Sequence, residues 1–212
     1  NNRQKKMILT FDECLQNEKK YFSHHILGGK AYNLIKMVKC NIPVPSGFVI
    51  PTTTFISFFQ SDKNLQKQVL RLLLTLRTST TSSVKTTTPF FIDDLEKIKI
   101  VANDIKELIL NKKLPDEMEK ALRAKCEKVF ENSDASFAVR SSGTAEDLAS
   151  HSFAGQYESY LNITSIDQLL NGIKNCWASL FTDRGLLYRL NNGFMDCLLT
   201  IKEEEKEDEE GI

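Results

Sequence analysis

The chain lacks an excess of charge of either sign: its 212 residues carry 28 lysines and arginines against 28 aspartates and glutamates. A net charge of zero gives no overall field that would draw the protein to a nucleic acid or an anionic membrane. No stretch approaches the roughly 20 apolar residues of a membrane-spanning helix. No apolar segment typical of a secretion signal follows the polar first six residues. We therefore expect no nucleic acid or membrane partner and a cytoplasmic location.

The chain also lacks paired cysteines. Its five cysteines stand at positions 14, 40, 126, 176 and 197, an odd number at wide spacings, and no C-x-x-C occurs. This pattern argues against a disulfide framework or a zinc site and favours a reducing compartment. Cys126 and Cys176 fall on apolar helix faces, which predicts that they are small core residues.

Two segments lack the apolar residues that a core requires. Residues 78–88 are almost entirely serine and threonine, and residues 202–210 contain seven acids and two bases. Neither can bury enough apolar surface to offset the entropy of ordering, so we predict a disordered loop at 78–88 and a disordered acidic tail at 201–212. The remainder, residues 1–200, is interpreted as one domain.

The rest of the chain alternates helical and extended patterns. Apolar residues at helical spacing predict helices over 30–39, 52–60 and 63–77, from 93, from 115 and after 165, whereas 48–50, 136–140 and 158–163 read as strands. Residues 7–9 are a candidate short strand, and the first 27 residues otherwise give no firm prediction. The pattern indicates an α/β (α+β) protein in which helices pack on a small mixed sheet. The residues expected to be buried are Phe48, Val49, Ala138, Val139, Leu161 and Trp177.

Small residues surround an arginine in the most informative stretch, FAVRSSGTAED at 137–147 followed by SFAGQYES at 152–159. A strand here delivers Arg140 to a loop of serine, glycine and threonine. Such residues let backbone N–H groups approach phosphate oxygens closely, and the guanidinium adds a planar fork that suits phosphate. The pattern predicts an anion-binding loop, in keeping with a nucleotide ligand.

A second segment, GGK at 28–30, stands directly before an amphipathic helix. Glycines, a lysine and the N–H groups of a helix N-terminus together favour phosphate binding. The spacing is not that of a Walker A loop. If both segments serve one ligand, the heads of Lys30 and Arg140 should lie within about 10 Å of each other.

Five motifs in fixed order give the chain a family resemblance. They are GGKAYNL at 28–34, IPVPSGFVI at 42–50, AVRSSGTAEDL at 138–148, SFAGQ at 152–156 and CWASLFTDR at 176–184. Together they resemble the N-terminal nucleotide-binding domain of the phosphoenolpyruvate synthase, pyruvate phosphate dikinase and rifampicin phosphotransferase family, over residues 28–189. Ala31 stands where the family usually has glycine, and Gly143 where it usually has alanine. Both changes exchange one small residue for another.

The resemblance implies an ATP-grasp-like fold in which two lobes clamp ATP. It assigns phosphate contacts to Lys30 and Arg140, close backbone approach to Gly155, and a hydroxyl contact to Ser159. Taken alone, Lys30 could be an exposed lysine at a helix start, and Arg140 could brace the loop by pairing with an acid at 146 or 147.

The loop hydroxyls leave two readings open. Ser141, Ser142 and Thr144 either donate to phosphate or cap backbone groups of the protein. Glu146 and Asp147 could touch Mg²⁺, but the resemblance places the magnesium carboxylates in a second lobe beyond residue 189, so no residue of the chain is assigned to a metal. The three histidines, at 24, 25 and 151, do not match the family's phosphohistidine motif.

The resemblance implies an ATP-dependent phosphotransferase or kinase that passes phosphate from ATP through a phosphohistidine to pyruvate or a similar acceptor. The phosphohistidine and acceptor domains are absent from the 212 residues, so we expect this chain alone to be inactive. The alternative is a catalytically inactive remnant that acts as a nucleotide-binding or scaffolding protein.

Overall fold

The computed structural model describes residues 6–79, 92–131, 136–144, 147–148, 151–152 and 158–191. Gly155, the predicted acidic tail at 201–212 and positions 80–88 of the predicted loop lie outside the described residues. None of the helices in the described ranges is long and apolar enough to cross a membrane.

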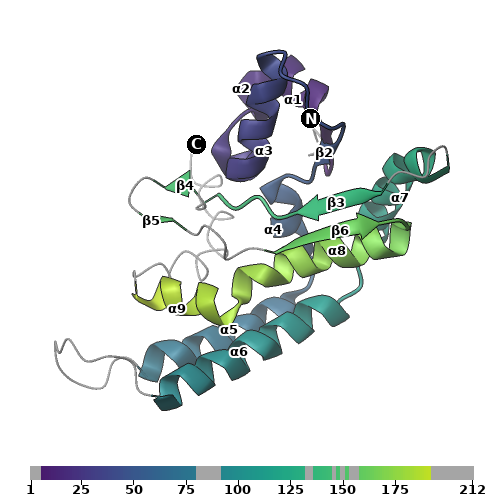
Figure 1. The fold of residues 1–212 in the computed structure, drawn as a ribbon. Coiled ribbons are helices and arrows are strands. Elements are labelled where there is room, and N and C mark those ends of the chain that lie inside the picture. The colour runs from purple at the N-terminus through teal and green to yellow at the C-terminus, as the bar shows by residue number, and fades with distance from the viewer. Residues whose placement is uncertain are drawn as a thin grey trace, which may run out of the picture.

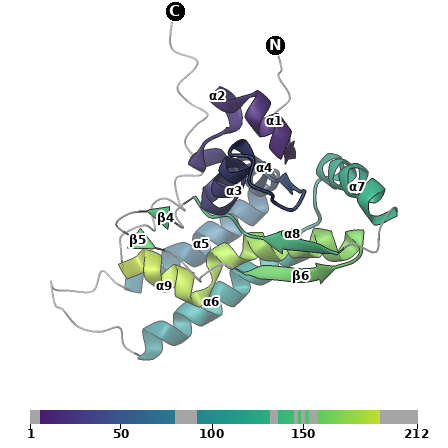
Figure 2. The same cartoon turned by 45° about the horizontal axis from the view of Figure 1, so that its top comes forward.

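The body of the molecule is layered (Figure 1). Helices α5 (Lys63–Ser79) and α6 (Ile92–Asn111) lie side by side at the bottom, beneath α8 (Ile166–Ala178), the 3-10 turn η1 (Ser179–Phe181) and α9 (Asp183–Asn191). On top of α8 lies the antiparallel pair β3 (Phe137–Arg140) and β6 (Ser159–Ile163). Helix α7 (Asp116–Glu131) stands beside one end of α8 and the pair (Figure 2).

The N-terminal segment forms a separate layer, which meets the loop that follows β3 and leaves the outer face of the β3–β6 pair open. Strand β1 (Leu9–Thr10) pairs with β2 (Phe48–Val49). The chain that connects these two strands forms the helices α1 (Phe11–Gln16), α2 (Glu18–Tyr21) and α3 (His24–Lys39). Helix α4 (Thr52–Gln60) then leads into the body of the molecule. A third pair, β4 (Asp147–Leu148) with β5 (His151–Ser152), is equally short.

The large core fills the space between the helices and the β3–β6 pair. Apolar stripes at helical spacing on α5, α6, α7 and α8 meet there, as the periodicity predicts. The indole of Trp177 packs against the ring of Phe58 on α4, and the two ring centroids lie 4.8 Å apart. Trp177 is half-buried, whereas we expected it to be buried. Fully buried members include Phe58, Val69, Leu73, Ile105, Ile109, Met118, Leu122 and Leu186.

A smaller, second core lies under the N-terminal helices. Its buried residues are Leu9, Cys14, Leu27, Ala31, Ile35 and Val49. Helix α1 begins with a capping box, in which the Thr10 hydroxyl accepts from the Glu13 amide at 3.2 Å and the Glu13 carboxylate accepts from the Thr10 amide at 2.8 Å. The T-x-x-E pattern that encodes this cap was present in the sequence, and our reading overlooked it.

The structure confirms the α/β class, but the described strands form three antiparallel pairs and no single mixed sheet. Helix α5 extends to Ser79, two residues into the segment predicted to be disordered. The predicted burial of Ala138 and Leu161 is wrong: both are exposed, Leu161 by 67%. Alternation along the strands turns Val139 and Tyr160 toward α8 and leaves Ala138 and Leu161 on the opposite, uncovered face.

Candidate functional site

Gly28 breaks helix α3 into two parts. Its backbone has φ 71° and ψ 170°, so the helix begins again after this residue. A Cβ atom at this position would lie 1.9 Å from the carbonyl oxygen of Ser142, a backbone atom that cannot move aside cheaply. Both the left-handed φ and the close approach therefore require glycine here.

The loop after β3 is fastened to the restarted helix by three hydrogen bonds. The Gly29 amide donates to the Gly143 carbonyl oxygen at 3.0 Å, and the Ala31 amide donates to Ser142 Oγ at 2.9 Å. Lys30 Nζ donates to the Ser141 carbonyl oxygen at 3.3 Å. We call residues 28–31 and 141–143 the clasp, because it joins two motifs that lie more than 100 positions apart in the sequence.

The hydrogen bonds of the clasp occupy two of the amide groups at the start of the second part of α3. The sequence led us to expect free N–H groups at this terminus as a phosphate site, and this is wrong for Gly29 and Ala31. Their amides already donate to Gly143 and Ser142. A helix leaves its first N–H groups without partners inside the helix, and here the protein itself satisfies two of them.

Ser141 is tied to the neighbouring strand. Its hydroxyl donates to the Glu158 carbonyl oxygen at 3.0 Å, and its amide reaches the same oxygen at 3.4 Å. The Cys176 thiol also points to this oxygen, at 3.8 Å. Burial raises the pKa of Cys176 to about 11, which keeps the thiol protonated at neutral pH. Ser141 thus has the backbone-bonding role that was one of its two alternatives.

Arg140 and Ser159 are neighbours on the uncovered face of the β3–β6 pair. They are register partners across the two strands, and both are exposed. Residues directly opposite each other in an antiparallel pair have Cβ atoms about 5 Å apart on the same face. The opposite face is closed by α8, where Val139 comes so near the Gly172 backbone that a Cβ there would lie 3.3 Å from its methyl group.

The candidate residues that the structure describes lie around one end of this strand pair. Lys30 reaches the carbonyl of Ser141, the residue that follows Arg140, while Ser142 belongs to the clasp and the exposed Thr144 comes next in the loop. The distance between the Lys30 and Arg140 heads remains a prediction. Among the described residues, no group of three or more His, Cys, Asp or Glu side chains could hold a metal ion.

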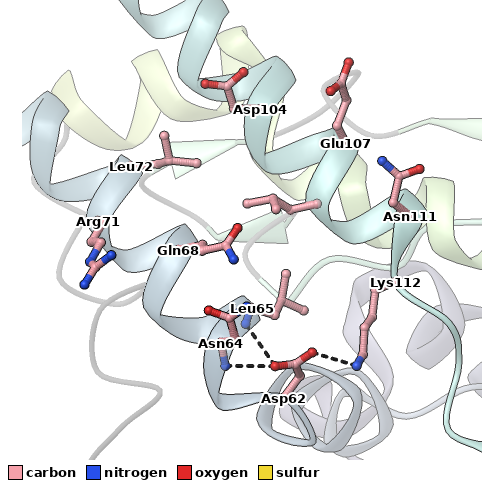
Figure 3. Close-up of a pocket in the computed structure, with 11 residues that line it drawn as sticks. Asp62, Asn64, Leu65, Gln68, Arg71, Leu72, Asp104, Glu107, Asn111 and Lys112 are labelled. Carbon is pink, nitrogen blue, oxygen red and sulfur yellow. Dashed lines mark hydrogen bonds and ion pairs between the residues drawn. The ribbon is translucent and has the colours of Figure 1, made fainter.

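A different hollow, of about 640 Å³, lies along the outer side of α5 and α6 (Figure 3). At one end, Lys112 Nζ binds the Asp62 carboxylate at 2.7 Å, and Asp62 also accepts from the Asn64 and Leu65 amides at the start of α5. Its lining mixes Arg71 with Asp104 and Glu107 and includes neither Lys30 nor Arg140. The lining has three carboxylates, Asp62, Asp104 and Glu107, against two cations, Arg71 and Lys112, and so does not favour a polyphosphate.

Comparison with known proteins identifies the family. Residues 24–204 match the sequence profile of a protein family described as "Pyruvate phosphate dikinase, AMP/ATP-binding domain". The chain is 37% identical over 173 residues to a probable phosphoenolpyruvate synthase of Archaeoglobus fulgidus, 35% over 170 residues to the rifampicin phosphotransferase of Bacillus subtilis, and 34% over 176 residues to the phosphoenolpyruvate synthase of Aquifex aeolicus.

Each of these matches covers 80% of this chain but only 21%, 18% and 19% of the respective relative. The chain therefore spans about a fifth of the length of the curated relatives that it matches. The matched region contains both halves of the clasp and the β3–β6 pair, so the site described above lies inside the family's nucleotide-binding domain.

Proposed function

We propose that this chain, which belongs to the pyruvate phosphate dikinase AMP/ATP-binding domain family, holds the phosphates of ATP beside the clasp with Lys30 and Arg140. The observation that carries the proposal is the bond from Lys30 Nζ to the Ser141 carbonyl, which brings the lysine of one motif to the residue next to the arginine of the other. On this proposal, two cations from distant segments act on one ligand within the region that the family profile matches.

The chemistry of the donors fits a triphosphate. Lysine and arginine offset its charge, and the guanidinium can bond two phosphate oxygens at once. Ser159 stands opposite Arg140 in the strand register and adds a hydroxyl on the same open face. Thr144 and the backbone around Gly155 are proposed as further donors. Magnesium, which offsets phosphate charge when bound, is proposed to take its carboxylate ligands from outside these 212 residues.

For the full-length protein we propose an ATP-dependent phosphotransferase that uses a phosphohistidine to pass phosphate to pyruvate or a similar acceptor. Phosphoryl transfer depends mainly on positioning and on stabilising charge. The residues described here supply only part of that positioning. We therefore expect the 212-residue chain to show no turnover, and pyruvate-dependent AMP formation by the purified chain would contradict this expectation.

The test of nucleotide binding is a calorimetric titration of the 212-residue chain with ATP. We expect a dissociation constant on the order of millimolar, equivalent to about 4 kcal/mol, because charge supplies most of the attraction. Binding should weaken as salt is added. Arg140→Ala should abolish measurable binding, and Lys30→Ala should weaken it.

Two variants serve as controls for this titration. Arg71→Ala removes the same charge from the hollow along α5 and α6, and His151→Ala changes a residue of β5 that has no proposed role. Both should bind ATP as the unchanged chain does. If Arg140→Ala also binds normally, Arg140 braces the loop and the proposed phosphate role is wrong. If Arg71→Ala abolishes binding, the ligand sits in the hollow.

A further inference from the structure

Ser142 makes a contact that its place in a phosphate-binding motif does not explain. Its Oγ accepts the amide hydrogen of Ala31, 111 positions away, at 2.9 Å. We propose that Ser142 is a positioning residue that caps the second part of α3 and thereby directs Lys30 toward the nucleotide. The inference rests on the proposed function, since it concerns how one phosphate contact is held in place.

The restarted helix has no cap of its own. Helix N-termini are usually capped by the side chain of the preceding residue, most often serine, threonine, aspartate or asparagine. The residue before this helix segment is Gly28, which has no side chain. Ser23, which precedes the first part of α3, makes no side-chain capping bond either. The capping oxygen for Ala31 therefore comes from a distant segment, and Ser142 supplies it.

Ser142 already occupies the position that a phosphate oxygen would need in order to bind the Ala31 amide. The position of a Cβ on Gly28 lies 2.6 Å from Ser142 Oγ and 1.9 Å from Ser142 O, so the loop backbone touches the helix start directly. A phosphate oxygen could reach the Ala31 amide only by displacing the hydroxyl.

Lys30 stands between the two amides that the loop satisfies. The Gly29 amide is held by Gly143 and the Ala31 amide by Ser142, so the backbone on both sides of the lysine is fixed to the loop that follows Arg140. Fixing this backbone limits where the flexible lysine side chain can reach. Ser142 therefore acts on the nucleotide through Lys30, and it contributes to affinity only while Lys30 is present.

The test compares Ser142→Ala and Ser142→Thr in the 212-residue chain, each with and without Lys30→Ala. The first readout is amide hydrogen exchange at residues 29–31 without nucleotide. Ser142→Ala should speed exchange of the Ala31 amide about fivefold, the change expected for a lost capping bond, and Ser142→Thr should restore the slow rate. Circular dichroism establishes that each variant folds.

The second readout is ATP affinity, measured by titration followed by amide chemical shifts. Ser142→Ala should weaken binding about three- to tenfold when Lys30 is present and should have no further effect in the Lys30→Ala background. A serine that touches phosphate directly would give losses that add and would leave exchange in the free protein unchanged. Either of those results overturns the positioning role.

The Arg140→Ala titration, run beside these variants, separates this inference from the proposed function. If ATP does not bind at the clasp at all, Arg140→Ala will bind as the unchanged chain does, whatever happens to the Ala31 amide. If ATP binds there but Ser142→Ala leaves Ala31 exchange slow, the proposed function stands and the role of Ser142 is wrong.

Discussion

The core beneath α1–α3 contains six buried apolar residues among those described, whereas the core around α5, α6 and α8 contains 22. The large core joins several long amphipathic helices. The small one joins short helices and a pair of two-residue strands, and so few buried side chains give a unit of this size little stability of its own.

Polar contacts join the small core to the large one. Thr52 Oγ1 donates to the His25 carbonyl at 2.7 Å and Thr54 Oγ1 to the Met7 carbonyl at 2.9 Å, both from α4. The clasp is a second junction of this kind, and it includes Lys30. The comparison teaches that the proposed phosphate site lies where a weakly packed unit meets a strongly packed one. Its geometry therefore depends on these hydrogen bonds together with the packing of Met7, Ile8, Phe48 and Ile50 against the large core.

The largest effect on stability should come from replacing a buried isoleucine by alanine in the large core, and the same replacement in the small core serves as the comparison. Ile105 on α6 and Ile35 on α3 are both fully buried. Ile105→Ala should lower the free energy of unfolding by about 2–5 kcal/mol in urea denaturation, because the filled core cannot collapse around the cavity. Ile35→Ala should mainly speed hydrogen exchange within residues 9–39. Equal acceleration of exchange in α6 by both variants would show that the two cores unfold as one.

The next largest effect should follow from Gly28→Ala. The new Cβ meets the Ser142 backbone, and the left-handed φ is unfavourable for alanine, so we expect a loss of about 1–3 kcal/mol. Exchange at residues 29–31 should rise, and ATP binding should be lost. Gly172→Ala is the comparison: its Cβ would meet the Val139 side chain at 3.3 Å, a contact that a small shift of that side chain can relieve, and alanine favours the helix. A Gly28→Ala chain with normal affinity would show that the clasp does not position the site.

A smaller effect, on how stability depends on pH, should come from the ion pair of Asp62 and Lys112 beside the large core. The pKa of the Asp62 carboxyl is lowered because Lys112 donates a hydrogen bond to it and the Leu65 and Asn64 amides add two more. Since the folded pKa lies below the unfolded one, the stabilisation is present above about pH 4 and is lost as the pH falls through the folded value.

Asp62→Asn keeps a capping side chain at the start of α5 and removes the charge. Urea midpoints of the two chains should therefore differ at neutral pH and converge in acid. A difference that stays constant with pH would show that the ion pair with Lys112 contributes nothing.

The smallest effect is a difference in thiol reactivity that leaves stability unchanged. Cys40, at the end of α3, is exposed, while burial raises the pKa of Cys14, Cys126 and Cys176 to about 11. Iodoacetamide reacts with thiolates, so peptide mapping at neutral pH should find Cys40 modified well before these three. Early labelling of Cys14 but not Cys126 would show that the small core opens often.

Sequence reasoning recovered the helices of the large core and missed the first two helices of the small one. The stripe of Ile98, Val101 and Ile105 repeats at helical spacing, so local sequence determines α6. Helices α1 and α2 are too short for periodicity to reveal, although the Thr10–Glu13 box marks the start of α1. Ala138 and Leu161 were placed inside because they are apolar, but only the packing of α8 decides which face of the strands is covered.

The site shows a similar division. The motifs singled out Lys30 and Arg140, and the β3–β6 register sets Ser159 opposite Arg140. That the Ser142 hydroxyl would cap Ala31 could not be read from the sequence, because the two residues lie 111 positions apart and serine has many alternative partners. Tertiary packing alone selects that partner.

The central claim is that ATP binds at the clasp, where the two units meet. It is tested most directly by mapping amide chemical shifts of the 212-residue chain as ATP is added. We expect the largest changes at residues 28–31, 140–144 and 159, growing together along one binding curve and weakening with salt. Changes confined to the hollow, at residues 62–72 and 104–112, with the clasp unaffected, would contradict the account.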